Sequence, residues 1–352
     1  MLVQKRQLER GPKIVVLGGG TGLSNLLRGI KKYSGNVTAI VTVTDNGGSS
    51  GILREELGIL PPGDIRNCLV ALADTEPLME KLFQYRFDSR SGLAGHSFGN
   101  LFIAALSEIT GDFELAIKES SKVLAVRGRV IPSTLENAVL CAESESGRII
   151  KGETEIVANQ EKIKKLFLEP ADCSPVTEAL DALLSADMIV FGPGSLYTSI
   201  IPNLLVKGIV EAIKNSKALK VYVCNVMTQP GETDGYSAAD HLAALNSYLG
   251  QDIIDYIVVN NQEISKDLIE KYQKEGSQPV IVDLKRLIEM KVKIIARSLI
   301  QESDYVRHDP ERLAQTLIAL AVKKRGALDK ILGWDLVAYL AHTFTRKLKT
   351  KG

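Results

Sequence analysis

The sequence predicts an α/β fold built on a doubly wound, mostly parallel β-sheet. Short runs of β-branched and other apolar residues recur along the chain, and each run is apolar throughout, as expected for parallel strands covered on both faces. Stretches with helical periodicity separate these runs, and alternating β and α elements are typical of this fold class. The chain has 352 residues, of which 45% are hydrophobic, so it is long enough to bury a sizeable core.

Strand signals predict six strands, over residues 13–17, 37–43, 186–191, 220–224, 256–259 and 279–282. Helical spacing between these runs predicts helices over residues 23–32, 78–87, 101–109 and 177–184. Residues 141–170 combine strand and turn signals, which predicts a small hairpin beside the main sheet.

The chain is predicted to consist of an extension over residues 1–12, an α/β domain over residues 13–322, and a basic amphipathic helix over residues 323–352. Apolar side chains recur every three to four positions in that helix, at Ile331, Trp334, Val337, Ala338, Ala341, Phe344 and Leu348. The simpler interpretation is a helix docked on the domain, with its terminal cations placed favourably for the helix dipole. The alternative is a helix that contacts a membrane surface weakly or binds a partner.

The overall composition excludes several classes of protein. A formal net charge of +1 argues against a protein that mainly neutralises nucleic-acid phosphates. The four cysteines lie far apart without a CxxC pair, which argues against a zinc site or a disulfide framework. No apolar run reaches the roughly 18 residues that span a bilayer, and no apolar segment follows the basic N-terminus as in a signal peptide. We therefore expect a cytoplasmic protein that binds no nucleic acid and has no transmembrane segment.

Glycine-rich loops follow the first two predicted strands, at the sheet edge where open α/β folds bind their ligands. Residues 18–22 (GGGTG) open a helix, so that backbone amides and the helix dipole favour a phosphate there. The loop matches neither a Walker A motif nor GxGxxG, and a tight strand-to-helix turn is the alternative interpretation.

Residues 44–51 (TDNGGSSG) form a second candidate anion cradle, in which Asp45 is suited to a hydrated Mg²⁺. A flexible surface loop is the alternative there.

Further polar loops place charged side chains and hydroxyls at later strand ends. Asp64 follows a Pro-Pro-Gly turn as a candidate helix N-cap, whereas Arg66 in the same first turn opposes the helix dipole unless an anion lies nearby. His96, flanked by glycines in GHSFGN, is a candidate for acid–base chemistry, for a phosphate contact or simply for capping. Residues 192–199 (GPGSLYTS) and 225–233 (NVMTQPGET) carry hydroxyls and amides suited to phosphate oxygens.

Several such loops predict one shared site for a phosphorylated or nucleotide ligand. The residues predicted from them to bind the ligand are Gly19, Gly20, Thr21, Gly22, Asp45, Asn46, Gly47, Gly48, Ser49, Ser50, Asp64, Arg66, Asn67, His96, Asn100, Gly192, Pro193, Gly194, Ser195, Tyr197, Thr198, Asn225, Thr228 and Gln229. Asp45 is the one predicted metal ligand, for Mg²⁺, and no other cofactor is indicated. The sequence contains no GxSxG, HExxH or EF-hand motif, so no catalytic residue is assigned.

Six motifs, taken in order, resemble those of the YvcK/GlmR gluconeogenesis-factor family, which is related to the CofD 2-phospho-L-lactate transferases. They are GGGTG, TDNGGSSG, LPPGDIRNCLVALAD, GHSFGNL, GPGSLYTSIIPNLL and NVMTQPGET, and the resemblance runs from about residue 13 to about residue 320. It implies a Rossmann-like three-layer αβα sandwich with a mostly parallel sheet, plus the appended C-terminal helix, in a bacterial cytoplasmic protein.

The resemblance implies one of two activities. In the transferase branch, a guanosine-linked phospholactyl donor and a deazaflavin acceptor meet at this face of the sheet with the help of Mg²⁺. Members of the YvcK branch look like UDP-sugar binders, notably of UDP-N-acetylglucosamine. They act in growth on gluconeogenic carbon sources, in cell shape and in the supply of cell-wall precursors.

The C-terminal part of the chain favours the YvcK branch. Residues 271–273 (KYQ) and 305–309 (YVRHD) resemble segments whose Tyr and Arg contribute to UDP-sugar binding, which assigns these roles to Tyr272 and Arg307. An aromatic face is suited to stacking on uracil, and a guanidinium is suited to a diphosphate. Without the resemblance, a surface Tyr and an Arg paired with Asp309 would explain the same residues.

The chain departs from the family pattern at two positions. Asn46 stands where many relatives carry a second acid, which weakens any metal site and argues against transferase chemistry. Pro310 stands where some relatives carry a phosphorylatable Thr, so that mode of regulation does not carry over.

We therefore expect a UDP-sugar-binding regulator whose ordered loops are read by a partner enzyme of cell-wall precursor synthesis. The glycine loops after the first and third predicted strands, residues 18–22 and 192–195, would cradle the diphosphate. The side chains expected to line the sugar side are Asp45, Asp64, Arg66 and His96. The alternative is a CofD-like transferase that moves a phospholactyl-type group from a nucleotide-linked donor, with Mg²⁺ held by Asp45. The sequence leaves turnover and homo-oligomer formation open.

Overall fold

A computed structural model of the chain describes residues 7–74, 77–88, 92–159 and 161–328. Its centre is a seven-stranded sheet with the strand order β10-β9-β8-β7-β1-β2-β3, in which every neighbouring pair is parallel. The strands are β1 (Ile14–Gly18), β2 (Val37–Val41), β3 (Arg129–Pro132), β7 (Met188–Phe191), β8 (Leu219–Val223), β9 (Tyr256–Asn260) and β10 (Lys293–Arg297). The chain builds outward from β1 in one direction and from β7 in the other, so the strand order reverses between these two neighbours. This reversal is the position where doubly wound sheets bind ligands.

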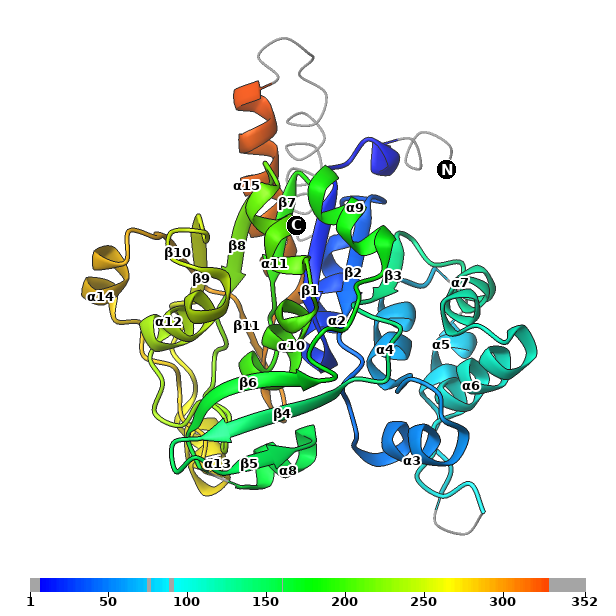
Figure 1. The fold of residues 1–352 in the computed structure, drawn as a ribbon. Helices are drawn as coiled ribbons and strands as arrows, with labels where there is room; N and C mark the ends of the chain where they lie inside the picture. The colour runs from blue at the N-terminus through cyan, green and yellow to red at the C-terminus, as the bar shows by residue number, and fades with distance from the viewer. Residues whose placement is uncertain (1–6, 75–76, 89–91, 160, 329–352) are drawn as a thin grey trace.

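Helices cover both faces of the sheet, which confirms the predicted three-layer α/β architecture (Figure 1). The helices are α2 (Gly20–Ile30), α3 (Gly48–Leu57), α4 (Gly63–Leu72), α5 (Pro77–Gln84), α6 (Phe98–Thr110), α7 (Phe113–Val123), α8 (Glu153–Asn159), α9 (Thr177–Ser185), the π-helical turn η1 (Leu196–Ile200), α10 (Ile201–Leu205), α11 (Ile209–Asn215), α12 (Ala238–Leu249), α13 (Lys266–Lys274), α14 (Leu284–Glu289) and α15 (Pro310–Leu328). Side chains along β1 alternate between two cores: Val15 and Leu17 pack with α9 to α12, whereas Ile14 and Val16 pack with α2, α4 and α15. The period of two in a strand therefore explains why β1 is apolar throughout.

The predicted hairpin within residues 141–170 is a separate three-stranded antiparallel sheet with the order β5-β4-β6. Its strands are β4 (Val139–Ser144), β5 (Ile149–Lys151) and β6 (Ile163–Glu169), and α8 lies between β5 and β6 in the chain. In Figure 1 this small sheet crosses the main sheet at the end where the loops after β1 and β2 emerge. It therefore brings α8 close to the predicted site.

One predicted strand is wrong. Residues 279–282 form no strand; Pro279 makes a single β-bridge with Met227, and the segment then leads into α14. A proline cannot donate to a ladder, and Val280 and Val282 line a cavity instead of a sheet interior. The sheet also contains β3 and β10, which the sequence did not predict. Both are edge strands. β10 (KIIAR) is charged at both ends, and β3 (RVIP) begins with an arginine and ends with a proline, so neither has the continuous apolar run that marks the central strands.

The C-terminal part begins with the antiparallel hairpin β11 (Ile300–Glu302) and β12 (Val306–His308), followed by α15, which packs on α2. This helix crosses the predicted boundary at residues 322/323. The apolar positions predicted for the basic amphipathic helix, from residue 331 onward, lie outside the described residues. Within the described residues, no single helix is long and apolar enough to cross a membrane, although the bent pair Leu196–Leu205 and Ile209–Asn215 meets the length and composition of a span together.

The packing of α15 on α2 depends on Gly29. A Cβ at this position would collide with the carbonyl oxygen of Pro310 and lie 2.9 Å from the Cβ of Ala314. We expect Gly29→Ala to lower the free energy of unfolding by about 1–3 kcal/mol, because the helices would have to separate. Gly326→Ala is the control, since nothing lies within 4 Å of its added Cβ and alanine favours a helix. Equal melting temperatures for the two variants would contradict the prediction.

Candidate functional site

A cavity of about 500 Å³ opens at the carboxyl ends of β1, β7 and β8, where the strand order reverses. The predicted ligand-binding residues that line it are Gly19, Gly20, Thr21, Gly22, Pro193, Gly194, Ser195, Asn225, Thr228, Gln229, Tyr272 and Arg307. Segments that lie far apart in the sequence therefore meet at one place.

The two glycine loops of the cavity contact each other through their backbones. A Cβ at Gly22 would lie 2.7 Å from the carbonyl oxygen of Pro193, so a side chain there would force the loops apart. Gly20 has a φ of 65°, a left-handed conformation that glycine adopts without steric cost. The side-chain amide of Asn203 fixes the same region by donating to the carbonyl oxygens of Gly18 (3.2 Å) and Ser199 (2.8 Å). The floor of the cavity is consequently a close-packed backbone surface.

Carboxylates of the protein occupy the two helix starts at this floor. Asp64 accepts a hydrogen bond from the backbone N–H of Gly20, and burial together with nearby Asp45 raises its pKa to about 6. Glu232 accepts hydrogen bonds from the hydroxyl of Ser195 and from the backbone N–H of Tyr197, the latter at 3.3 Å. Burial raises the pKa of Glu232 as well, although these hydrogen bonds oppose the shift. The loops therefore differ from a phosphate-binding loop whose amides are free.

Tyr272 and Arg307 form the opposite wall of the cavity. The hydroxyl of Tyr272 donates to the carbonyl oxygen of Val306 (3.3 Å) and accepts from its N–H (3.0 Å), which ties α13 to the β11–β12 hairpin. Arg307 is exposed, and its guanidinium forms no ion pair or hydrogen bond with any residue that the structure describes. Asp309 instead caps α15, by accepting from the backbone N–H of Arg312 at 2.9 Å, and lies 3.7 Å from the Arg312 side chain. The cation of Arg307 is thus available to a ligand and does not pair with Asp309.

The remaining predicted residues do not line this cavity. They are Asp45, Asn46, Gly47, Gly48, Ser49, Ser50, Asp64, Arg66, Asn67, His96, Asn100, Gly192, Tyr197 and Thr198. Several of them form a buried network that joins the starts of α3, α4 and α6: Ser49 lies 3.1 Å from Nδ1 of His96 and accepts from Asn100 at 3.0 Å. Arg66 donates to the side chains of Asn100 (2.9 Å) and Asn67 (2.7 Å). The protein itself therefore supplies acceptors for this cation, whose pKa burial lowers to about 10.

The loop after β2 is tied to the small sheet. Asn46 donates to the carboxylate of Glu155 (2.8 Å) and accepts from the backbone N–H of Thr154 (3.0 Å), which fixes the start of α8. Asp45 accepts from the backbone N–H of Gly47 at 2.8 Å. The described residues contain no group of three or more His, Cys, Asp or Glu side chains arranged to hold a metal ion. They therefore do not form a complete metal site, and Asp45 as a Mg²⁺ ligand stays a prediction.

Several residues at the site were not among those predicted. The cavity is also lined by Asn25, Ser199, Val226, Met227, Pro230, Glu275, Ser277, Val306 and His308. Ser199, Glu232 and His308 lie inside the motifs GPGSLYTS, NVMTQPGET and YVRHD, so their proximity to the predicted residues could have identified them. Glu153 on α8 carries no such signal, because only the folding of the small sheet brings it to Thr198 and the site carboxylates.

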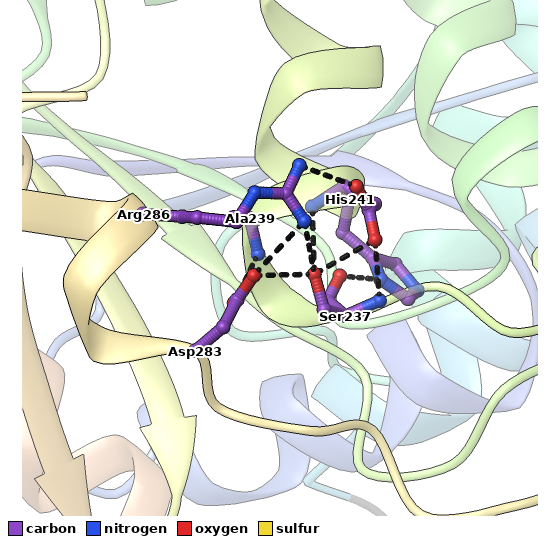
Figure 2. A network of polar contacts seen from close by, with 6 residues as sticks. Ser237, Ala239, His241, Asp283 and Arg286 are labelled. Carbon is purple, nitrogen blue, oxygen red and sulfur yellow. Dashed lines mark hydrogen bonds and ion pairs between the residues drawn. The ribbon is translucent and has the colours of Figure 1, made fainter. Parts of the chain in front are cut away.

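A second polar network lies beside the site, at the start of α12 (Figure 2). The hydroxyl of Ser237 donates to Asp283 (2.7 Å), and Arg286 reaches Asp283 (3.1 Å) and Asp240 (2.7 Å). Nδ1 of His241 lies 2.9 Å from the carbonyl oxygen of Ser237, so the histidine does not contact the serine hydroxyl as a general base would. The network therefore fixes α12 and the segment before α14. That segment forms one wall of a neighbouring cavity of about 400 Å³.

Glu153 is the most strongly perturbed carboxyl of the site. Burial and then the carboxylates of Asp45, Asp64 and Glu232 raise its pKa from 4.5 to about 9, so the folded protein keeps a proton that the unfolded chain releases. The contribution of this raised pKa to the free energy of unfolding is therefore fully present below about pH 4.5. It is lost as the pH rises to about 9, by at most about 1.4 kcal/mol per pH unit. Only wild type loses this contribution, so we expect Glu153→Gln to become more stable relative to wild type as the pH rises from 5 to 9. Urea denaturation measures the free energy of unfolding of both proteins. Parallel profiles for the two proteins would contradict the prediction.

Comparison with known proteins agrees with the fold and the motifs. A family model described as 2-phospho-L-lactate transferase CofD matches residues 14–300. A putative gluconeogenesis factor of Thermoanaerobacterium thermosulfurigenes is 54% identical over 315 residues, which cover 88% of this chain and 97% of that protein. The gluconeogenesis factor of Bacillus subtilis (strain 168) is 51% identical over 310 residues, which cover 88% of this chain and 98% of that protein.

A solved structure extends this likeness to three dimensions. The crystal structure of a UPF0052 family protein from Bacillus halodurans is 52% identical, covers 88% of this chain and 99% of its own, and gives a TM-score of 0.85. The chain therefore belongs to the 2-phospho-L-lactate transferase CofD family, in its YvcK group of gluconeogenesis factors.

Proposed function

We propose that the protein is a cytoplasmic regulator that binds a UDP-sugar, notably UDP-N-acetylglucosamine, in the cavity at the strand-order reversal. The observation that carries the proposal is the free guanidinium of Arg307, which faces two glycine loops across a cavity of about 500 Å³. A guanidinium can donate two hydrogen bonds to a diphosphate, and the glycines of the loops, which lack side chains, let the diphosphate approach the backbone closely. Tyr272 on the same wall offers an aromatic face for uracil.

The biological role that we propose is supported by the names of the relatives. They are named gluconeogenesis factors, and we propose that this protein acts in growth on gluconeogenic carbon sources, in cell shape and in the supply of cell-wall precursors. Ligand binding would order the loops around the cavity, and a partner enzyme of cell-wall precursor synthesis would bind the ordered surface.

A transferase reaction is the second candidate, because the matching family model is described as a 2-phospho-L-lactate transferase. Calorimetric titration with UDP-N-acetylglucosamine, GDP and GTP, with and without Mg²⁺, separates the two functions. Selective binding of the UDP-sugar supports the regulator, whereas guanine-nucleotide binding that requires Mg²⁺ supports the transferase.

We expect Arg307→Ala to weaken the binding of UDP-N-acetylglucosamine by about 10- to 100-fold, as for the loss of a charge-assisted hydrogen bond. Arg297→Ala is the matched control, because Arg297, like Arg307, is an exposed arginine within a strand but does not line the cavity. Calorimetry measures both affinities. Wild-type affinity in a folded Arg307→Ala variant would remove this residue from the proposed site.

We further expect Mg²⁺ to raise the affinity of the wild-type protein for the UDP-sugar through Asp45, since Mg²⁺ is commonly held by a carboxylate together with ligand phosphates. Asp45→Asn should abolish this increase, which titrations with and without Mg²⁺ measure. An equal effect of Mg²⁺ on both proteins would show that Asp45 does not hold the ion.

A further inference from the structure

The cavity at the strand-order reversal offers little positive charge to a ligand. Among the described residues that line it, Arg307 is the one Arg or Lys, and Glu275 lines the same cavity with the opposite charge. His308 also lines the cavity, but burial lowers its pKa to about 4, so it is uncharged at neutral pH. The phosphates of a bound ligand therefore meet a single cation among the described residues that line the cavity.

The helix starts that usually supply positive charge to a phosphate are neutralised here. At the start of α2, Asp64 accepts the N–H of Gly20. At the start of η1, Glu232 accepts from the hydroxyls of Ser195 and Thr198 and from the N–H of Tyr197. A carboxylate at a helix N-terminus cancels the partial positive charge on which phosphate binding depends. The glycine loops thus allow close approach of a ligand without attracting further negative charge.

We propose that Asp64 and Glu232 make the cavity select a nucleoside diphosphate whose terminal phosphate is esterified to a neutral group, and reject nucleotides that end in a free phosphate. This inference rests on the proposed function and adds the basis of its selectivity. A nucleotide sugar carries about two negative charges, whereas a nucleoside diphosphate carries about three at pH 8, because a free terminal phosphate loses its last proton near pH 6. The additional charge is repelled by both carboxylates and finds no second cation among the cavity-lining residues that the structure describes.

The test compares UDP-N-acetylglucosamine with UDP by calorimetric titration of the full chain at pH 8 in EDTA, so that no divalent cation bridges carboxylate and phosphate. We expect the wild-type protein to bind the UDP-sugar at least about tenfold more tightly than UDP, because like charges repel in a partly buried site. In Glu232→Gln, we expect the affinity for UDP to rise by about three- to tenfold while that for the UDP-sugar changes by less than about twofold. Glutamine keeps one acceptor oxygen and removes the charge.

Asp64→Asn provides a second variant with the same expected result, and thermal melting verifies that each variant is folded. Glu289→Gln is the matched control, because it removes one exposed carboxylate that neither lines the cavity nor lies at the start of α2 or η1. We expect it to leave the ratio of the two affinities unchanged.

Three results would overturn the inference and leave the proposed function intact. They are equal binding of UDP and the UDP-sugar by wild type, an unchanged ratio in the folded Glu232→Gln and Asp64→Asn variants, and a change of the ratio in Glu289→Gln as large as in those variants. Absence of UDP-sugar binding by the wild-type protein would overturn the proposed function itself.

Discussion

The backbone contact between the loops after β1 and β7 is the constraint on which the rest of the site depends. The contact requires glycine at position 22, because any side chain there would meet the carbonyl of Pro193. It also requires β1 and β7 to be neighbours, which only the reversal of strand order provides. With the two loops in contact, α2 and η1 begin next to each other, and both loops line the cavity. The remaining walls come from residues beyond β8, where α13 and β12 contribute Tyr272 and Arg307.

Burial of carboxyl groups distinguishes this site from an ordinary phosphate-binding loop. Glu232 and Asp64 use their oxygens to satisfy backbone amides that would otherwise remain unpaired at helix starts. The energetic cost of burying these acids appears as raised pKa values, and it is greatest for Glu153, which lies near several of them. The same groups connect the small sheet to the main one, since α8 carries Glu153 and is fixed by Asn46.

The sequence predicted the central strands well because burial on both faces leaves a continuous apolar run, as in β1 and β7. The same dependence on apolar runs explains why the strands at the edges of the sheet were not predicted. β10 is paired on one side, partly exposed and charged at both ends, so it lacks the continuous apolar run by which a strand is predicted. Of the apolar residues 279–282, by contrast, Pro279, Val280 and Val282 line a cavity and Ile281 is exposed. Hydrophobicity reports burial, and burial in a pocket wall and burial in a sheet cannot be told apart from one sequence.

By itself the sequence determined the fold class, the loops at the strand ends and the family, because glycine positions and apolar runs are local properties of the chain. Tertiary structure alone decided which loops share the cavity. It separated the network of Ser49, Arg66 and His96 from the cavity and left the guanidinium of Arg307 free of Asp309. It also placed Asp64 and Glu232 at helix starts that come from other segments. The physical reason is that pairing between charged groups depends on distance in space, and residues that are far apart in the chain become neighbours only when the sheet is assembled.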